Sequence, residues 1–503
     1  MQELPAQPPP PPSHTSADLL ALRVIQIGAL AAVLVVIPNA AFELDRFLVP
    51  KELVLHLTAV IAGLLALRSM HRIALTRVDW LLTAYLLLSA VSTAFATNRW
   101  LAIRAFAVSA SGIVLFWTAR GSREAGLERP LLNGFALAVV SAAITSLLQA
   151  YGLRLELFAS TRVPGGTLGN RNFVAHVAAF GLPICFLAAL RAQRTATYFA
   201  ASIGVAIVTA SLVLSRSRAA WIAFAVMFLI FFFGSLKMLG RFAGVLLFAA
   251  AGVAAALLLP NVLRWRSENP YVESVRGVAN YEEGSGRGRL LQYTRSLNLV
   301  LHHPLFGAGP GNWTVEYPAY VRGRDPSMNS SEPGTTFNPW PSSDWVAFAS
   351  ERGLAAAVLI ALAFIVIAVT ARDATLLATI AAVVVAGLFD AVLLLPVPTL
   401  LAWTAIGAMW SPQPTARPMR TPIVLAVIAI SAFGAFRSAS QVVAMEMYAS
   451  SRGHASLERA SQIDPGNYRI HMRLASRCQH ALAAHALFPN AEAARSVSRP
   501  CGK

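Results

Sequence analysis

The chain has 503 residues, of which 56% are hydrophobic and 13% are charged, and its formal net charge is +17. A soluble protein usually carries about a quarter charged residues, so this composition excludes an ordinary soluble enzyme. The excess of arginine does not indicate a nucleic-acid partner, because no recognisable nucleic-acid-binding module accompanies it. The sequence instead predicts an all-α polytopic membrane protein whose nearest partners are membrane lipids.

Residues 1–20 form a proline-rich start without the basic segment of a signal peptide, and we expect a disordered cytoplasmic tail there. About 12–13 apolar runs long enough to cross a bilayer follow it, the first nine within 21–259 and the last four within 350–436. A polar loop at 260–349 separates the two groups, and a helical tail occupies 437–503. The predicted spans are 24–42, 52–67, 79–96, 101–119, 131–151, 173–190, 196–214, 218–235, 242–259, 350–370, 374–393, 397–411 and 421–436.

The basic residues between these spans indicate the orientation of the chain. Cytoplasmic loops of membrane proteins are enriched in Lys and Arg. With the N-terminus in the cytoplasm, the inside loops carry Arg68, Arg72, Arg77, Arg120, Arg123, Arg129, Arg191, Arg194, Lys237, Arg241, Arg372, Arg417 and Arg420. This alternation predicts that the long loop and the C-terminal tail both lie on the outer side of the membrane.

Other basic residues fall on the predicted outer side, against the usual bias. They are Arg46, Lys51, Arg99, Arg154, Arg162, Arg171, Arg216 and Arg218. For any one of them, anchoring to lipid phosphates is an equal explanation. Together with Arg287, Arg289 and Arg295 of the long loop, they predict a site for an anionic headgroup, because a guanidinium group binds phosphate through two parallel N–H bonds.

Two acidic residues lie at the ends of predicted spans. Asp390 falls in the outer half of a span, where an ionisable residue is costly and is therefore a candidate functional group. A structural Asp paired with arginine or exposed to water is an equal alternative. Glu351 lies where the long loop re-enters the membrane, and a charge that stabilises the start of a helix explains it equally well.

The segment 288–313, GRLLQYTRSLNLVLHHPLFGAGPGNW, lies within the long loop. Its glycines at 307, 309 and 311 favour a tight turn after a helix, although the backbone amides of such a turn also bind phosphate. The segment lacks the Lys-Ser/Thr of a nucleotide-binding loop. Aromatic residues nearby fit either sugar stacking or an interfacial belt, namely Trp313, Tyr317, Tyr320, Trp340 and Trp345.

Five stretches follow one another in order on this predicted topology. They are GTLGNRNFVAHV (166–177), SRSRAAWIA (215–223), the segment 288–313, SDWVAFASERGL (343–354) and GLFDAVLLLPVPTLLAWTAIGAMW (387–410). As an ordered set they resemble the O-antigen ligase and O-antigen polymerase superfamily of bacterial polytopic glycosyltransferases. The resemblance extends over about residues 20–415, most of the chain, although each stretch alone is a weak signal.

The resemblance implies a transferase in the bacterial inner membrane, with its N-terminus in the cytoplasm. Such a protein transfers a glycan from undecaprenyl pyrophosphate to an acceptor at the periplasmic face. The acceptor is lipid A–core in ligases, another glycan in O-antigen or exopolysaccharide polymerases, and a protein in related enzymes. The resemblance implies no cofactor and no metal. A non-catalytic binder or a transporter of lipid-linked glycan is the alternative of another class.

By position, Arg218 and Arg289 match the family arginines that hold the donor pyrophosphate, and Arg216 and Lys51 are further candidates. Fixed cations are needed there because the leaving pyrophosphate gains negative charge during transfer.

The loop departs from the family at one position. A histidine of the family, which activates the acceptor hydroxyl, is replaced by Ser342, and serine cannot accept a proton near neutral pH. The alternative bases are Asp344, Glu351 and His303 with its neighbour His302. The departure also favours the non-catalytic alternative.

The tail at 437–503 resembles part of a tetratricopeptide array. One and a half repeats cannot bury a core alone, since about three are needed, so we expect the tail to pack on the outer loop or on a partner. Cys478 and Cys501 pair only in an oxidising compartment, and free thiols are an equal alternative. Cys185 lies in a predicted span, where we expect it to pack.

Overall fold

The computed structural model describes residues 14–38, 42–67, 73–234, 239–265, 267, 269–277, 284–411, 418–451 and 453–502. Within these ranges every regular element is a helix, apart from isolated bridges between Ala74 and Pro418 and between Met328 and Thr336. The all-α prediction is therefore confirmed. Residues 1–13 of the predicted tail, and the inside residues Arg68, Arg72, Lys237 and Arg417, lie outside the described ranges.

Nine helices of the described chain are long and apolar enough to cross a membrane. They are α1 (Ser16–Leu34), α2 (Asp45–Leu65), α4 (Arg77–Phe95), α5 (Arg99–Glu124), α6 (Glu128–Ala150), α7 (Arg171–Leu190), α8 (Thr195–Ser215), α10 (Leu239–Leu258) and α18 (Thr421–Ser450). Shorter apolar helices accompany them, namely α9 (Arg218–Gly234), α15 (Leu354–Val369), α16 (Ala374–Phe389) and α17 (Pro396–Met409). Together they correspond one by one to the predicted spans.

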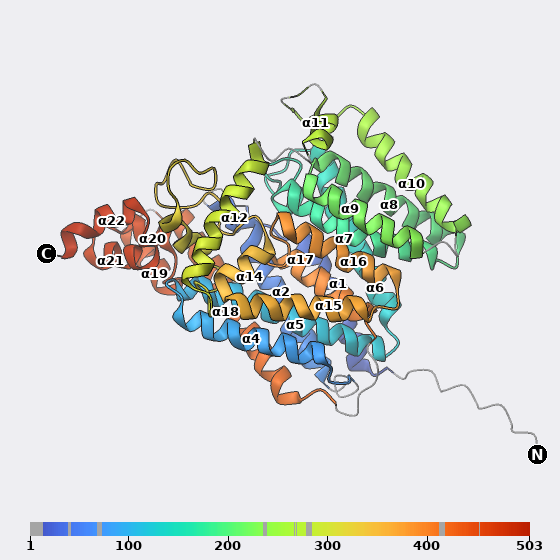
Figure 1. Ribbon diagram of the computed structural model, residues 1–503, viewed down its shortest axis with the longest axis horizontal. Helices are drawn as coiled ribbons and strands as arrows, with labels where there is room; N and C mark the ends of the chain where they lie inside the picture. The colour runs from blue at the N-terminus through green and yellow to red at the C-terminus, as the bar shows by residue number, and fades with distance from the viewer. Residues whose placement is uncertain are drawn as a thin grey trace, which may run out of the picture.

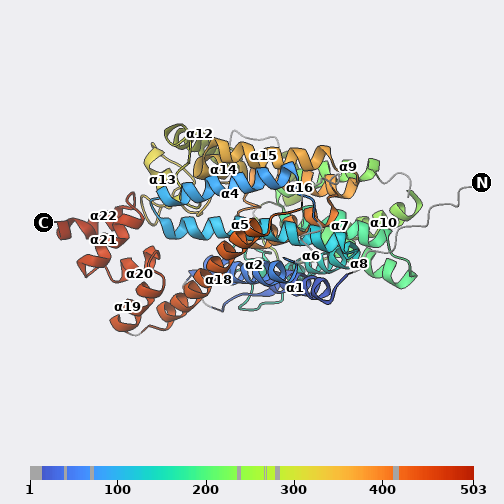
Figure 2. The same ribbon diagram turned by 90° about the horizontal axis from the view of Figure 1, so that it is seen from below.

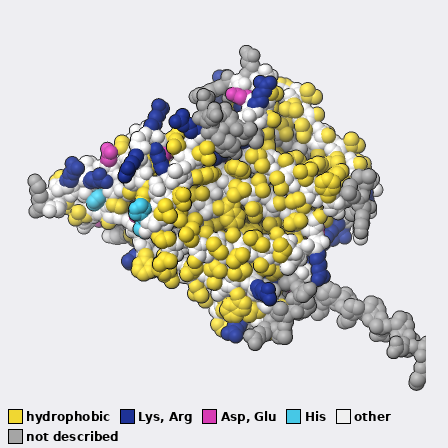
Figure 3. Space-filling view, viewed as in Figure 1, with side chains coloured by type: hydrophobic (Ala, Val, Ile, Leu, Met, Phe, Trp, Pro, Cys, Tyr) yellow, Lys and Arg dark blue, Asp and Glu magenta, His cyan; other side chains and the backbone are white. Residues whose placement is uncertain are grey.

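The apolar helices form one bundle, from which the C-terminal segment projects beside the long loop (Figures 1 and 2). On the face shown in Figure 3, apolar side chains cover the middle of the bundle, and Lys and Arg gather toward its edges. This distribution is the one expected of a helix bundle in a bilayer. α5 and α17 lie in the centre and approach closely, because Gly112 faces Trp403 and Gly407 faces the backbone of Phe116.

α1 begins earlier than we predicted, because a capping box starts the helix. The Thr15 hydroxyl accepts the Asp18 N–H, and the Asp18 carboxylate accepts the Thr15 N–H at 2.8 Å. Each side chain thus satisfies an N–H group that the first turn leaves without a partner. Residues 16–20, which we predicted as part of the disordered tail, are therefore helical, and the first span lies closer to the N-terminus than 24–42.

The long loop contains short helices and a glycine-rich turn. The helices are α11 (Pro270–Arg276), α12 (Gly284–His302), α13 (Trp313–Glu316), η4 (Tyr317–Tyr320) and α14 (Asp344–Arg352). The turn after α12 packs on α14, since the N–H groups of Ala308 and Gly309 donate to the carbonyls of Ser350 and Glu351 at 2.9 and 2.8 Å. These amides are engaged by the protein, as the tight-turn interpretation requires.

The C-terminal tail begins as a continuation of α18, which runs to Ser450, beyond the predicted boundary at 436. It then folds into α19 (His454–Ile463), α20 (Tyr468–Arg473), α21 (Cys478–Leu487), α22 (Glu492–Ser498) and η5 (Arg499–Gly502). A disulfide joins Cys478 to Cys501, and Cys185 is a buried free thiol.

The tail packs on the long loop and on the bundle, the first of the two arrangements that we expected. The Asn490 amide donates to the Val315 carbonyl of the loop at 2.9 Å. The buried Asp464 carboxylate accepts the indole N–H of Trp100 from α5 and lies 3.8 Å from the Arg437 guanidinium of α18. These contacts fix the tail against both neighbours.

Candidate functional site

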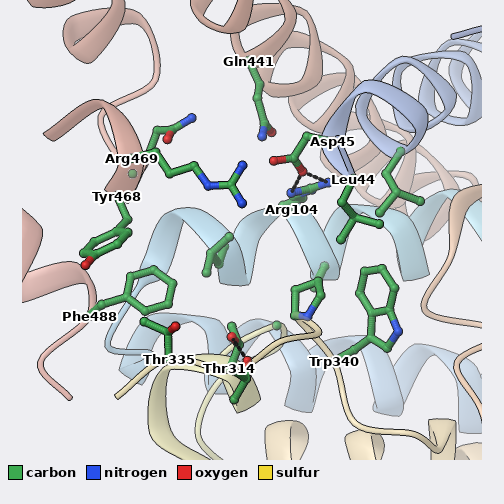
Figure 4. Close-up of a pocket in the computed structure, with 18 of the residues that line it drawn as sticks. Leu44, Asp45, Arg104, Thr314, Thr335, Trp340, Gln441, Tyr468, Arg469 and Phe488 are labelled. Carbon is green, nitrogen blue, oxygen red and sulfur yellow. Dashed lines mark hydrogen bonds and ion pairs between the residues drawn. The ribbon is translucent and has the colours of Figure 1, made fainter. Parts of the chain in front are cut away.

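A cavity of about 330 Å³ lies where α2, α5, α18, the long loop and the tail meet (Figure 4). We call it the central cavity. Its size is at the lower end of small-molecule pockets, which measure about 300–1,000 Å³. Polar and aromatic side chains dominate its wall, among them Asp45, Glu52, Arg104, Thr314, Glu332, Phe337, Trp340, Glu351, Arg437, Gln441, Asp464, Tyr468, Arg469 and Phe488.

Most charges in the wall of the cavity are paired with one another. Arg104 on α5 donates through Nε to both oxygens of Glu52, at 3.0 and 2.8 Å, and lies 3.4 Å from Asp45. Both acids come from the first turns of α2. Arg437 on α18 donates to Gln441 at 2.8 Å and faces Asp464. Charges at the ends of membrane helices are costly unless paired, so this pairing stabilises the ionised groups in the wall.

Glu351 lies in the wall of the central cavity and is 1% exposed. One of its carboxylate oxygens, Oε2, accepts the Gly311 N–H at 2.8 Å and lies 3.3 Å from the Arg352 guanidinium. The other oxygen, Oε1, has no hydrogen-bond partner among the described residues. Burial raises the pKa of this carboxyl, against the opposing charge of Arg352. A buried carboxylate with one unsatisfied oxygen is suited to accept a proton.

Two arginines lie against one indole and a third lies near them, and we call Arg162, Arg171 and Arg216 the arginine cluster. The guanidinium carbons of Arg171 and Arg216 lie 4.9 and 4.6 Å from the centre of the Trp265 ring. Arg162 lies close enough for its charge to act on Arg171. The positive charges of Arg162 and Arg216 act unfavourably on Arg171, so a bound anion would be favourable at the cluster.

Arg216 and its neighbour Arg218 also hold the short helix α11 in place. Arg216 donates through Nε to the Ser274 hydroxyl at 2.9 Å and lies 3.6 Å from the exposed Glu273 carboxylate. Arg218 donates to the carbonyl of Gly277, at the end of the helix. These arginines therefore connect the membrane bundle with the start of the long loop.

A polar group on α7 and α16 completes this side of the molecule. The Asp390 carboxylate accepts the Asn172 amide at 3.0 Å and lies 3.7 Å from the fully buried His176 ring. Arg289 of α12 lies close enough for its charge to act on His176. Arg289 has no hydrogen-bond or ion-pair partner in the described part of the chain. Its guanidinium is thus available to a ligand.

The central cavity and the arginine cluster adjoin each other. Arg162 lies over the Phe337 ring, 5.7 Å from its centre, and Phe337 lines the cavity. Trp340, another wall residue, packs on Phe173 of α7 with ring centres 6.1 Å apart. A ligand that bridges a cationic group and a polar cavity would fit this arrangement.

A match to known proteins now connects this geometry with a family. Residues 203–361 match the family model described as O-antigen ligase. This segment is thus similar to an O-antigen ligase domain. It extends from α8 into α15 and includes Arg216, Arg218, Arg289, His303, Ser342, Asp344 and Glu351. No curated protein matches the chain.

Within the matched segment, Ser342 and Asp344 lie close to the start of α14. The Ser342 N–H donates to Gln292 at 2.6 Å. Both oxygens of the buried Asp344 accept backbone N–H groups, those of Val392 and Leu393, at 2.9 Å each. Burial raises the pKa of Asp344 to about 7, although these N–H groups oppose the shift. Asp344 thus ties α14 to the connection between α16 and α17.

The remaining candidates lie away from the cavity wall. His303 is exposed just after α12, and its neighbour His302 bonds through Nδ1 to the Asn298 carbonyl at 2.8 Å. Lys51 is buried in α2, where its ammonium donates to the Val35 carbonyl. The structure therefore brings Asp344, Asp390 and Arg289 into one neighbourhood, sets Glu351 in the central cavity, and leaves His303 on the surface.

Several polar groups of the site were missed from the sequence. His176 reads as an ordinary helix residue, and Trp265 is one aromatic residue in a long loop. Arg104 and Glu52 could have been found from the sequence, because ionisable residues inside apolar helices are functional candidates by default. For a metal, no group of three or more His, Cys, Asp or Glu side chains lies together in the described ranges.

Proposed function

We propose that the protein is a glycan transferase of the O-antigen ligase type at the periplasmic face of a bacterial inner membrane. Its donor is a glycan on undecaprenyl pyrophosphate, and its acceptor is lipid A–core, another glycan or a protein. The observation that carries the proposal is the arginine cluster, with the free Arg289 nearby, adjoining a polar cavity that contains the buried Glu351 carboxylate.

In the proposed reaction, the arginine cluster and Arg289 bind the donor pyrophosphate. An acceptor hydroxyl in the central cavity attacks the anomeric carbon of the donor glycan, and the bond between that carbon and the phosphate oxygen breaks. The electron pair leaves with the lipid pyrophosphate, whose growing charge the guanidinium groups stabilise. Glu351 accepts the proton of the hydroxyl.

Most other candidate residues have roles outside the proposed reaction. Asp344 and Asp390 position the connection between α16 and α17, because their carboxylates bind its backbone and Asn172. Arg216 and Arg218 both hold α11, and Arg216 also belongs to the arginine cluster. Lys51, His303 and Ser342 have no proposed contact with the reacting atoms.

The disulfide between Cys478 and Cys501 supports an outer location for the tail, since disulfides persist in oxidising compartments such as the bacterial periplasm. The central cavity is shared by the tail and the long loop, so the proposed site lies on the same side. With thirteen spans, the N-terminus would then be cytoplasmic.

A second candidate is a non-catalytic binder of lipid-linked glycan. Ser342 stands where the family has a histidine, and this observation favours that candidate. A polymerase that joins glycan repeats uses the same donor and the same chemistry, so only the identity of the acceptor separates it from a ligase.

The test uses proteoliposomes that contain the full chain, an undecaprenyl-pyrophosphate-linked oligosaccharide and a mixture of acceptors, with glycan release followed by mass spectrometry. We expect Arg289→Ala to lower release about 10²- to 10³-fold, the usual loss for one charge-stabilising group. Arg287→Ala is the matched control, because Arg287 is an exposed arginine on another face of α12. Equal release by both variants would contradict the donor role. Donor binding by the native chain without any release would establish the second candidate.

A further inference from the structure

The C-terminal tail forms one wall of the central cavity, although it lies outside the matched ligase domain at 203–361. Beyond the end of α18, it contributes Asp464, Gly466, Asn467, Tyr468, Arg469 and Phe488 to the wall. The tail is fixed there by the contacts of Asp464 with Trp100 and Arg437. An element held against a cavity in this way can determine which ligands enter it.

Arg469 is the unpaired cation of this wall. Its guanidinium extends toward the middle of the cavity (Figure 4) and lies 5.4 Å from the centre of the Phe42 ring. Among the described residues it has no hydrogen-bond or ion-pair partner. The two other arginines of the wall differ, because Arg104 is bonded to Glu52 and Arg437 faces Asp464. A guanidinium without a counter-charge binds a carboxylate or a phosphate through paired N–H bonds.

Two aromatic rings lie beside this guanidinium. The Tyr468 and Phe488 rings are 4.8 Å apart on the tail side of the cavity, and Trp340 lies on the opposite side (Figure 4). Flat apolar faces next to polar groups suit a sugar, which has apolar C–H faces and polar hydroxyl edges. The cavity volume of about 330 Å³ has room for a short saccharide rather than a whole lipid.

We propose that the tail recognises the acceptor, and that the acceptor is a saccharide unit with an acidic substituent. Arg469 binds the carboxylate or phosphate of that unit, while Tyr468 and Phe488 pack against its ring. A hydroxyl of the same saccharide then faces Glu351 from within the cavity. This inference rests on the proposed function in that it calls the bound saccharide the acceptor. The binding site itself does not require that transfer takes place.

The test measures equilibrium binding of defined saccharides to the full chain in lipid nanodiscs, with no donor present. Three oligosaccharides of equal length are compared: a neutral one, one with a uronic acid and one with a phosphate. We expect the native chain to prefer one of the acidic forms, which identifies the substituent. Arg469→Gln should weaken binding of that form about ten- to hundredfold and leave the neutral form unchanged.

Arg459→Gln is the matched control, because Arg459 is an exposed arginine of α19 that does not line the cavity. This variant removes the same charge from the tail and should bind all three saccharides as the native chain does. Phe488→Leu should weaken the neutral and acidic forms alike, because the ring packs against the sugar and not against its charge. Intact folding is checked by the thermal unfolding of each variant.

Two outcomes would overturn the inference: a native chain without preference for an acidic form, or an Arg469→Gln variant that binds the acidic form unchanged. Failure of the proposed function looks different. In that case the native chain binds the acidic saccharide through Arg469 but releases no glycan from the lipid carrier.

Discussion

At the scale of single residues, the structure distinguishes between carboxylates that the sequence left equivalent. Asp344 has both oxygens bonded to backbone N–H groups, and Asp390 is bonded to Asn172. Glu351 alone of these three lines the central cavity. The hydrogen-bonded oxygens are committed to positioning the chain, whereas Oε1 of Glu351 has capacity left for a proton.

The first prediction concerns the pH dependence of transfer. A general base works when ionised, so activity should fall as the pH falls through the pKa of Glu351. Because burial raises that pKa, the decline should lie above pH 4.5, the ordinary value for this carboxyl. Glu351→Gln should lower the maximal rate about 10²- to 10⁴-fold and remove the decline, as measured by glycan release between pH 4 and pH 8.

The Asp344→Asn variant is compared with Glu351→Gln. Burial raises the pKa of Asp344 to about 7, so a decline in activity near neutral pH could come from either carboxyl. We expect Asp344→Asn to keep the acid decline. A decline that disappears in Asp344→Asn and persists in Glu351→Gln would assign the base to Asp344 instead.

At the scale of elements, the break between α14 and α15 sets the position of Glu351. Gly353 joins the two helices with a φ of 87°, a conformation that side chains with a Cβ atom rarely adopt. A Cβ atom added there would lie 2.1 Å from the carbonyl oxygen of Leu305. The glycine thus allows the turn after α12 to pack against the end of α14.

The second prediction is that Gly353→Ala destabilises the protein and lowers transfer, since the turn and α14 must separate. Gly323→Ala is the matched control, because Gly323 also has a positive φ, 71°, but has open space around it. Strain of the backbone alone costs on the order of 1–3 kcal/mol at such positions. We expect a clearly larger fall in the thermal unfolding temperature for Gly353→Ala. Equal falls would mean that the close approach to Leu305 contributes nothing.

At the scale of the whole molecule, the two chain ends should lie on opposite sides of the membrane. An odd number of spans requires this, and the disulfide between Cys478 and Cys501 favours an oxidising compartment for the tail. The central cavity would then be built entirely on the outer side, from span ends, loop and tail.

The third prediction concerns labelling of the cysteines in intact cells. After treatment with a membrane-impermeant reductant, Cys478 and Cys501 should react with a membrane-impermeant maleimide. Cys185 is the internal control, because it is buried in α7 and should stay unlabelled until the protein is denatured. Labelling of the tail only after the membranes are opened would place it in the cytoplasm.

The sequence by itself determined the fold class, the approximate spans and the resemblance to a family. Long apolar runs predict helices without knowledge of their neighbours, because a helix satisfies its own backbone hydrogen bonds. The family was recognisable because its motifs keep their order along the chain. Even the boundary errors at residues 16–20 and at 437–450 have local causes, a capping box and a helix that continues beyond the apolar run.

Only the tertiary structure decided which polar groups act together. Arg104 meets Glu52, Arg216 meets Trp265, and Arg469 reaches a cavity whose wall includes α2 and α5, hundreds of residues earlier in the chain. The tail was the largest gap, since its weak repeat pattern gave no indication that it lines the central cavity. Charge, burial and an unsatisfied oxygen depend on neighbours in space, and sequence periodicity describes only neighbours on the same helix.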